Sequence, residues 1–86
     1  MTTALMWEAR AAGGRAAELA AWVRSEALPA LRGPAGPERA EVFGAPGERV
    51  LLITWWAGEP AAVPDPPSEL LARPVHRWSF TSQHVE

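Results

Sequence analysis

The side chains best suited to chemistry lie close together in the stretch HRWSFT, residues 76–81. A histidine titrates near neutral pH, so His76 is a candidate general base. An arginine can stabilise the negative charge that proton removal leaves on a substrate, and Arg77 and Arg10 are the candidates for that role. Trp78 and Phe80 stand beside them and could hold an aromatic ring.

A structural interpretation of the same residues stays open. Alternation along a strand places His76 on one face with Trp78 and Phe80, and a lone histidine there is more often a hydrogen-bonded core or strand-end residue. Arg77 and Arg10 can instead form cross-strand ion pairs with Glu8. Aromatic side chains in a small sheet protein are ordinarily core.

Other site classes find little support in the sequence. The two histidines, His76 and His84, fit no standard zinc spacing, and the chain has no cysteine. The pair at Gly13 and Gly14 is an isolated turn rather than a phosphate-binding loop. The single aspartate, Asp65, suits a helix cap, so no Ser-His-Asp set is expected. We therefore predict no metal site and no cofactor.

Length and charge restrict the classes of partner. The 86 residues are expected to form one domain, residues 1–86. The formal charge is −2 with acids and bases interspersed, so no basic stripe is available for nucleic acid. The longest uncharged run falls far short of the ~20 apolar residues of a membrane span. With no cysteine, the composition favours a cytoplasmic protein that binds neither nucleic acid nor membrane.

The hydrophobic pattern predicts six elements in the order β-α-β-β-α-β. Strands are expected at residues 4–11, 38–44, 49–56 and 75–81. A helix should begin near Arg15 and end or bend near Leu28, because Pro29 lacks an N–H group. A second, short helix should follow a cap at Asp65 and end before Pro74. This order predicts an α+β, ferredoxin-like fold, in which the first and third strands are central and two helices cover one face of a four-stranded antiparallel sheet.

The third predicted strand, RVLLITWW, is apolar on both faces. Trp55 lies on one face with Leu51 and Ile53, and Trp56 lies on the other with Leu52. An antiparallel strand with one solvated face should show polar residues at alternate positions. Because two helices can cover only one face, we expect a second copy of the sheet to cover the other, in a two-fold homodimer. Trp22, on the polar side of the first helix, is expected to rest on the stem of Arg15 or to mark a contact surface.

The layout resembles the dimeric α/β-barrel superfamily, and within it the antibiotic-biosynthesis monooxygenase-like domains. The likeness covers nearly the whole chain and is architectural. It consists of the helix end WVRSEALPAL with a Gly/Pro break, the hairpin RAEVFGAPGERVLLITWW ending in Trp56, and the last strand HRWSFTS. The resemblance implies a homodimer formed through sheet faces, and it places Trp56 rather than Trp55 on the helix side.

The resemblance also implies a function, the cofactor-independent oxidation of an aromatic or quinone-type metabolite. A base removes a phenol proton, an apolar slot holds the ring, and the resulting carbanion passes an electron to O₂. The base would be His76, the stabilising cation Arg77 or Arg10, and the ligand-binding slot would be built from Trp7, Trp56, Trp78 and Phe80. Heme degradation is not expected, because the chain has no asparagine and its predicted second helix has no histidine. The alternative function is a non-catalytic homodimeric domain that binds a small hydrophobic ligand or a protein partner.

Overall fold

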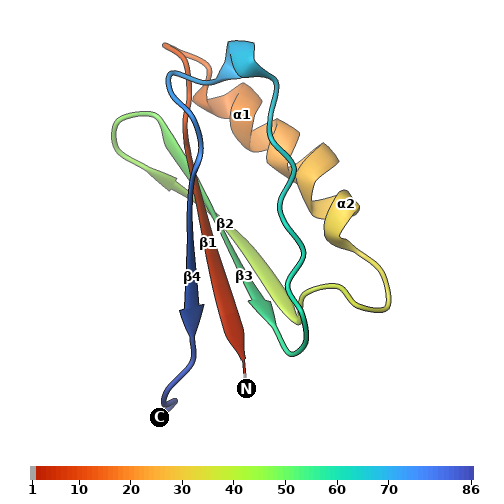
Figure 1. Cartoon of the computed structure of the whole chain (residues 1–86). Coiled ribbons are helices and arrows are strands. Elements are labelled where there is room, and N and C mark those ends of the chain that lie inside the picture. Colours follow the sequence, from red (N-terminus) through yellow and green to blue (C-terminus); the bar gives the residue numbers. More distant parts are fainter. Residues whose placement is uncertain (1) are drawn as a thin grey trace.

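The chain folds into a four-stranded antiparallel sheet with one long helix packed across one of its faces (Figure 1). The computed structural model describes residues 2–86. The sheet has the order β2-β3-β1-β4, so the first and third strands are central, as predicted. Each predicted strand end lies within one residue of the observed one. The strands are β1 (Thr3–Arg10), β2 (Arg39–Ala45), β3 (Arg49–Trp56) and β4 (His76–Thr81).

The long helix consists of three consecutive segments. These are α1 (Ala16–Trp22), a π-helical segment η1 (Val23–Ala27), and α2 (Leu28–Leu31). The helix therefore does not end near Leu28, one of the two predicted outcomes, because helical structure continues to Leu31. Within η1 the N–H of Leu28 donates to the carbonyl of Val23, five residues back. This wider turn places Pro29 in the first turn of α2, where a missing N–H is tolerated.

The predicted second helix is wrong in extent. Only a 3₁₀ turn, η2 (Ser68–Leu70), forms, and no side chain caps it. Before it, residues 57–67 run in extended form alongside the long helix (Figure 1), and we call this segment the strap. Four prolines keep the strap extended. The sheet is therefore covered by one helix and the strap, where two helices were expected.

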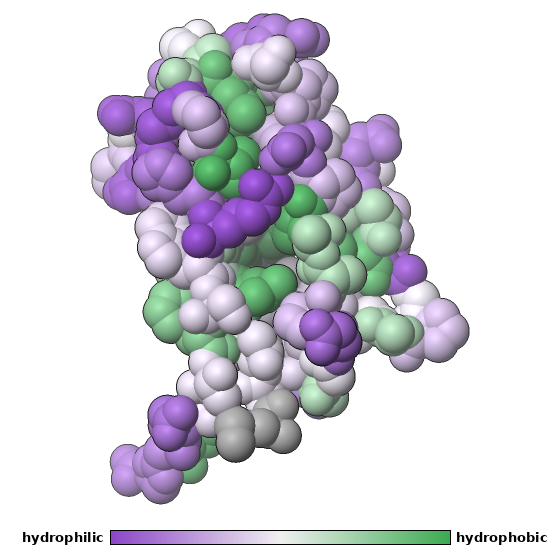
Figure 2. All heavy atoms as spheres, viewed as in Figure 1, coloured by the Kyte–Doolittle hydropathy of each residue, from purple (hydrophilic) through white to green (hydrophobic). Residues whose placement is uncertain are grey.

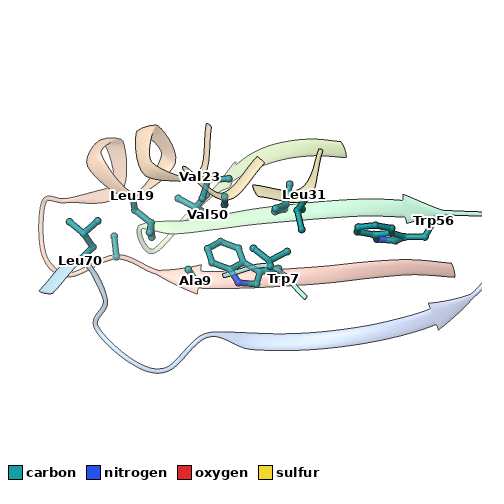
Figure 3. Packing of buried hydrophobic residues seen from close by; sticks show 12 residues of the cluster. Trp7, Ala9, Leu19, Val23, Leu31, Val50, Trp56 and Leu70 are labelled. Carbon is teal, nitrogen blue, oxygen red and sulfur yellow. The ribbon is translucent and has the colours of Figure 1, made fainter. Parts of the chain in front are cut away.

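The core lies between the long helix and the sheet, on what we call the helix face (Figure 3). The apolar stripe predicted for the helix is confirmed, since Leu19, Val23, Ala27 and Leu31 are all buried. Trp56 is also buried on this face, and its indole N–H donates to Oγ1 of Thr54 at 2.8 Å. Of the two adjacent tryptophans, Trp56 is thus the one that faces the helix.

Trp22 lies elsewhere than predicted. Its ring stacks on the ring of Trp7, with centroids 6.5 Å apart, and it is half-buried. Arg15 does not support Trp22, because its guanidinium binds Glu18 and the carbonyl of Glu69. The helix therefore contributes an aromatic ring to the core, where the sequence had placed it on the polar side.

The opposite face of the sheet, which we call the open face, has no cover among residues 2–86. The pairing register aligns on it the side chains of alternate residues from all four strands. Its larger apolar members are Met6, Phe43, Leu51, Ile53, Trp55, Trp78 and Phe80. Trp78 and Phe80 are 43% and 52% exposed. No helix in the described chain has the length and apolar character needed to cross a membrane.

Candidate functional site

A pocket opens on the helix face between β1, β4 and the strap. Its volume is about 210 Å³, and its wall is formed by Leu5, Met6, Trp7, Ala62, Val63, Arg77, Trp78 and Ser79. In the register of the sheet Leu5 lies opposite Ser79, and Trp7 lies opposite Arg77. Figure 2 shows the hollow near the middle of the view, with hydrophobic side chains around it and hydrophilic ones at its border. The strap, which runs where a second helix was expected, forms one side of the pocket through Ala62 and Val63.

Arg77 is the charged residue in the pocket wall. Its Nη2 donates to the carbonyl oxygen of Val63 at 2.9 Å and to Oδ1 of Asp65 at 2.8 Å. The guanidinium therefore joins β4 to the strap across one side of the pocket. Asp65, predicted as a helix cap, is the acidic partner of this ion pair instead.

Trp7 forms part of the pocket wall as well as the centre of the core. The residue is 1% exposed, and its indole Nε1 has no hydrogen-bond partner among the described residues. A buried donor without an acceptor is unusual, because most buried polar groups in proteins are paired. The unpaired N–H distinguishes Trp7 from Trp56, whose indole is satisfied by Thr54.

His76 lies on the open face, in a cluster of charged groups at the edge of the apolar surface. Glu8 is buried there, and it accepts hydrogen bonds from Arg73 at 2.6 Å and from Arg49 at 3.2 Å. His76 stands 3.7 Å from the same carboxylate, with a ring nitrogen 2.9 Å from Nη1 of Arg73. The rings of His76 and Trp78 also form a T-shaped pair, with their centroids 5.7 Å apart. The ion pairs expected between Glu8 and Arg10 or Arg77 are not formed. Glu8 pairs with Arg49 and Arg73 instead.

The predicted site residues are divided between the two faces of the sheet. Trp7, Trp56 and Arg77 lie on the helix face, while His76, Trp78 and Phe80 present their side chains to the open face. Trp78 contributes to the pocket wall from its position in β4, although its ring lies beside His76. Trp56 is not part of the wall. The six residues therefore do not form a single slot with His76 as its base.

The sequence interpretation did not include the pocket residues Leu5, Val63 and Ser79. Alternation in β4 does give a signal for Ser79, because it shares a face with Arg77. Val63 is the one branched apolar residue in the proline-rich strap, which marks it as an anchor. Among residues 2–86 no three histidine, aspartate or glutamate side chains converge closely enough to hold a metal ion.

Arg73 holds the pKa of Glu8 below its ordinary value by donating a hydrogen bond to the carboxylate. Burial opposes this shift, and Arg49 adds to it. A carboxylate whose pKa is lowered by folding stabilises the native state at pH values above the ordinary pKa of that carboxylate. That contribution is lost as the pH falls through the lowered value.

We expect Glu8→Gln to reduce the free energy of unfolding at pH 7 by about 1–2 kcal/mol, because two charge-assisted hydrogen bonds are weakened while their arginines are partly solvated. The difference from the wild type should shrink as the pH falls below about 4.5, the ordinary pKa of a glutamate, and through the lowered pKa of Glu8. Urea unfolding followed by circular dichroism at several pH values measures it. Glu26→Gln, which removes an exposed acid from the helix, is the matched control; an equal effect in both variants would contradict the role of the cluster.

Comparison with known proteins gives a match in structure. No family model matches the chain, and no curated protein matches it in sequence. The chain is similar to the solved structure described as Rv0793 from Mycobacterium tuberculosis, with a TM-score of 0.73 and 16% sequence identity. The match covers 99% of this chain and 98% of the other. At this identity the likeness shows the α+β, ferredoxin-like fold and leaves the roles of individual residues to the geometry of the site.

Proposed function

We propose that the chain binds a small aromatic ligand in the helix-face pocket and does so as a homodimer formed through the open faces of two sheets. The observation that carries the first part is the pocket itself, an apolar hollow with one guanidinium at its side. Ligand sites are typically apolar clefts with a few placed polar groups. The resemblance of the sequence to monooxygenase-like domains supports the same class of ligand.

The size of the pocket limits the ligand. A volume of about 210 Å³ is smaller than the roughly 300–1,000 Å³ of sites for drug-sized molecules. It is larger than a cavity of about 150 Å³ that accepts benzene. A molecule of one or two fused rings therefore matches the volume of the pocket, whereas a larger polycyclic ligand exceeds it.

The homodimer is supported by the composition and dimensions of the open face. Four strands about 4.8 Å apart and about seven residues long present a face of roughly 450 Å², so two such faces would bury on the order of 1,000 Å². This is near the lower limit for a specific interface. The apolar side chains lie across all four strands, and the Glu8 cluster lies at their border. A second copy of the chain is the partner that fits this surface, because a two-fold axis would place the open face of one copy against the same face of the other.

Cofactor-free oxidation of the bound aromatic molecule is the second candidate function. Arg77 beside an apolar wall favours it, since a guanidinium there would stabilise a phenolate. His76 lies on the other face of the sheet, with its side chain half exposed, and is not part of the pocket wall. Oxidation in this pocket would therefore start from a phenol that is already ionised in solution, and turnover should not depend on His76.

We expect 1,4-naphthoquinone, titrated into ¹⁵N-labelled protein, to shift the amide signals of the pocket residues. Ser79→Trp should fill the hollow and weaken binding at least tenfold. Thr81→Trp, on the same strand and face but outside the wall, is the matched control and should leave the affinity unchanged. His76→Ala should likewise bind normally.

Two results would contradict this proposal. One is a set of shifts confined to the open face around Trp78 and Phe80, which would place the ligand there. The other is O₂ uptake with a hydroquinone that His76→Ala abolishes, because the reacting site would then include the open face.

A further inference from the structure

The strap is held to the rest of the domain by few interactions. Between Glu59 and Pro66 the described chain makes no hydrogen bond from main chain to main chain. Of the strap residues between these limits only Val63 and Pro66 are buried. The ordering of the segment therefore depends on its prolines, on these two side chains and on Arg77.

The ion pair that joins the strap to β4 is at the surface. The side chain of Asp65 is 75% exposed and that of Arg77 is 44% exposed. A salt bridge between solvated groups shifts an equilibrium by only about twofold to fivefold. The pair therefore favours a strap that lies on the sheet without fixing it there.

The strap packs against a cluster that contains Trp7, whose indole N–H is unpaired among the described residues. Val63, which is buried in the same cluster as Trp7, also forms the pocket wall with it. The nitrogen is out of contact with solvent and has no acceptor among residues 2–86. A buried donor without an acceptor raises the free energy of the folded state. A ligand atom that accepts a hydrogen bond from this N–H would therefore remove that cost.

We propose that the strap, residues 57–67, is a movable cover that lifts at Val63 to admit a ligand whose carbonyl or phenolate oxygen accepts a hydrogen bond from Nε1 of Trp7. The proposal rests on the pocket of the proposed function and adds a polar requirement to the ligand. Arg77 is the residue that holds the cover closed, through Val63 and Asp65. An aromatic molecule with an acceptor oxygen is then preferred over a hydrocarbon of the same shape.

The closed strap is tested without any ligand, through hydrogen exchange of the tryptophan indole N–H groups measured by NMR. Asp65→Ala should speed the exchange of the Trp7 indole about twofold to fivefold, and Val63→Ala about tenfold or more, because each loosens the strap. Glu59→Ala, which removes another acid from the strap, is the matched control. The Trp56 indole, held by Thr54, should exchange at an unchanged rate and so report that the core is intact. Equal exchange at Trp7 in the wild type and both loosened variants would overturn the movable cover.

The acceptor is tested with two probes of equal ring size. In the wild type, 1,4-naphthoquinone should move the Trp7 indole proton signal downfield and slow its exchange, and it should bind at least fivefold more tightly than naphthalene. Trp7→Phe should remove that preference. Equal affinity of the two probes with an unmoved indole signal would overturn the hydrogen bond while leaving the binding pocket in place. Failure of both probes to bind, with Trp7 exchange still faster in Asp65→Ala, would contradict the proposed function and support the strap.

Discussion

A Trp78→Glu variant is expected to sediment as a monomer of about 9.3 kDa at concentrations where the proposed wild-type homodimer should sediment at twice that mass. Trp78 is 43% exposed on the open face and lies opposite Met6 of β1. A carboxylate at this position would have to be buried without a partner when two open faces meet. We expect the dissociation constant to rise at least 100-fold, equivalent to about 3 kcal/mol.

Analytical ultracentrifugation between 10 and 100 µM measures this effect. Thr81→Glu is the matched control, since it places the same charge on the same strand but on the helix face, and it should remain dimeric. Circular dichroism of both variants shows whether the sheet is retained. A wild-type chain that is monomeric across this range would contradict the homodimer directly.

The strands could be predicted from the sequence because alternation is a local signal. The strand ends were placed within one residue, and the residues that share a face along each strand were correct. The prediction of the second helix failed. Its signals, a cap at Asp65 and a proline at the first position, were also local, but packing against the core did not support them. Leu70 is its single buried non-proline side chain, and prolines at 66, 67 and 74 favour an extended chain. Asp65 was free to pair with Arg77 once no helix required a cap.

The candidate site was less predictable because it depends on contacts between distant parts of the chain. Alternation alone separates His76 from Arg77. Which of them shares a face with Trp7 depends on the pairing register, and Trp7 is aligned with Arg77. The position of Val63 over the pocket depends on the path of the strap, which has no periodic pattern to read. The pocket is thus a product of tertiary structure, and the sequence supplied only part of its wall.

The two adjacent tryptophans should respond very differently to truncation. Trp56 is 1% exposed, and its N–H is paired with Thr54. Trp55 is half-buried on the open face, where the guanidinium of Arg39 lies 5.0 Å from the centre of its ring. We expect Trp56→Ala to lower the free energy of unfolding by about 3–5 kcal/mol, from lost burial and the remaining cavity. Trp55→Ala should lower it by only about 1 kcal/mol in the monomer.

Urea unfolding in the Trp78→Glu background measures both effects without a contribution from the dimer. A domain of this size has roughly 4–13 kcal/mol of total stability, so Trp56→Ala can unfold it. Trp56→Phe then provides a folded variant in which a smaller loss, about 1–2 kcal/mol, is measurable. In the wild-type background Trp55→Ala should also weaken the dimer, whereas Trp56→Phe should not. Equal losses for the two alanine variants in the monomer would contradict the placement of Trp56 in the core and Trp55 on the open face, since only a fully buried side chain leaves a cavity when it is removed.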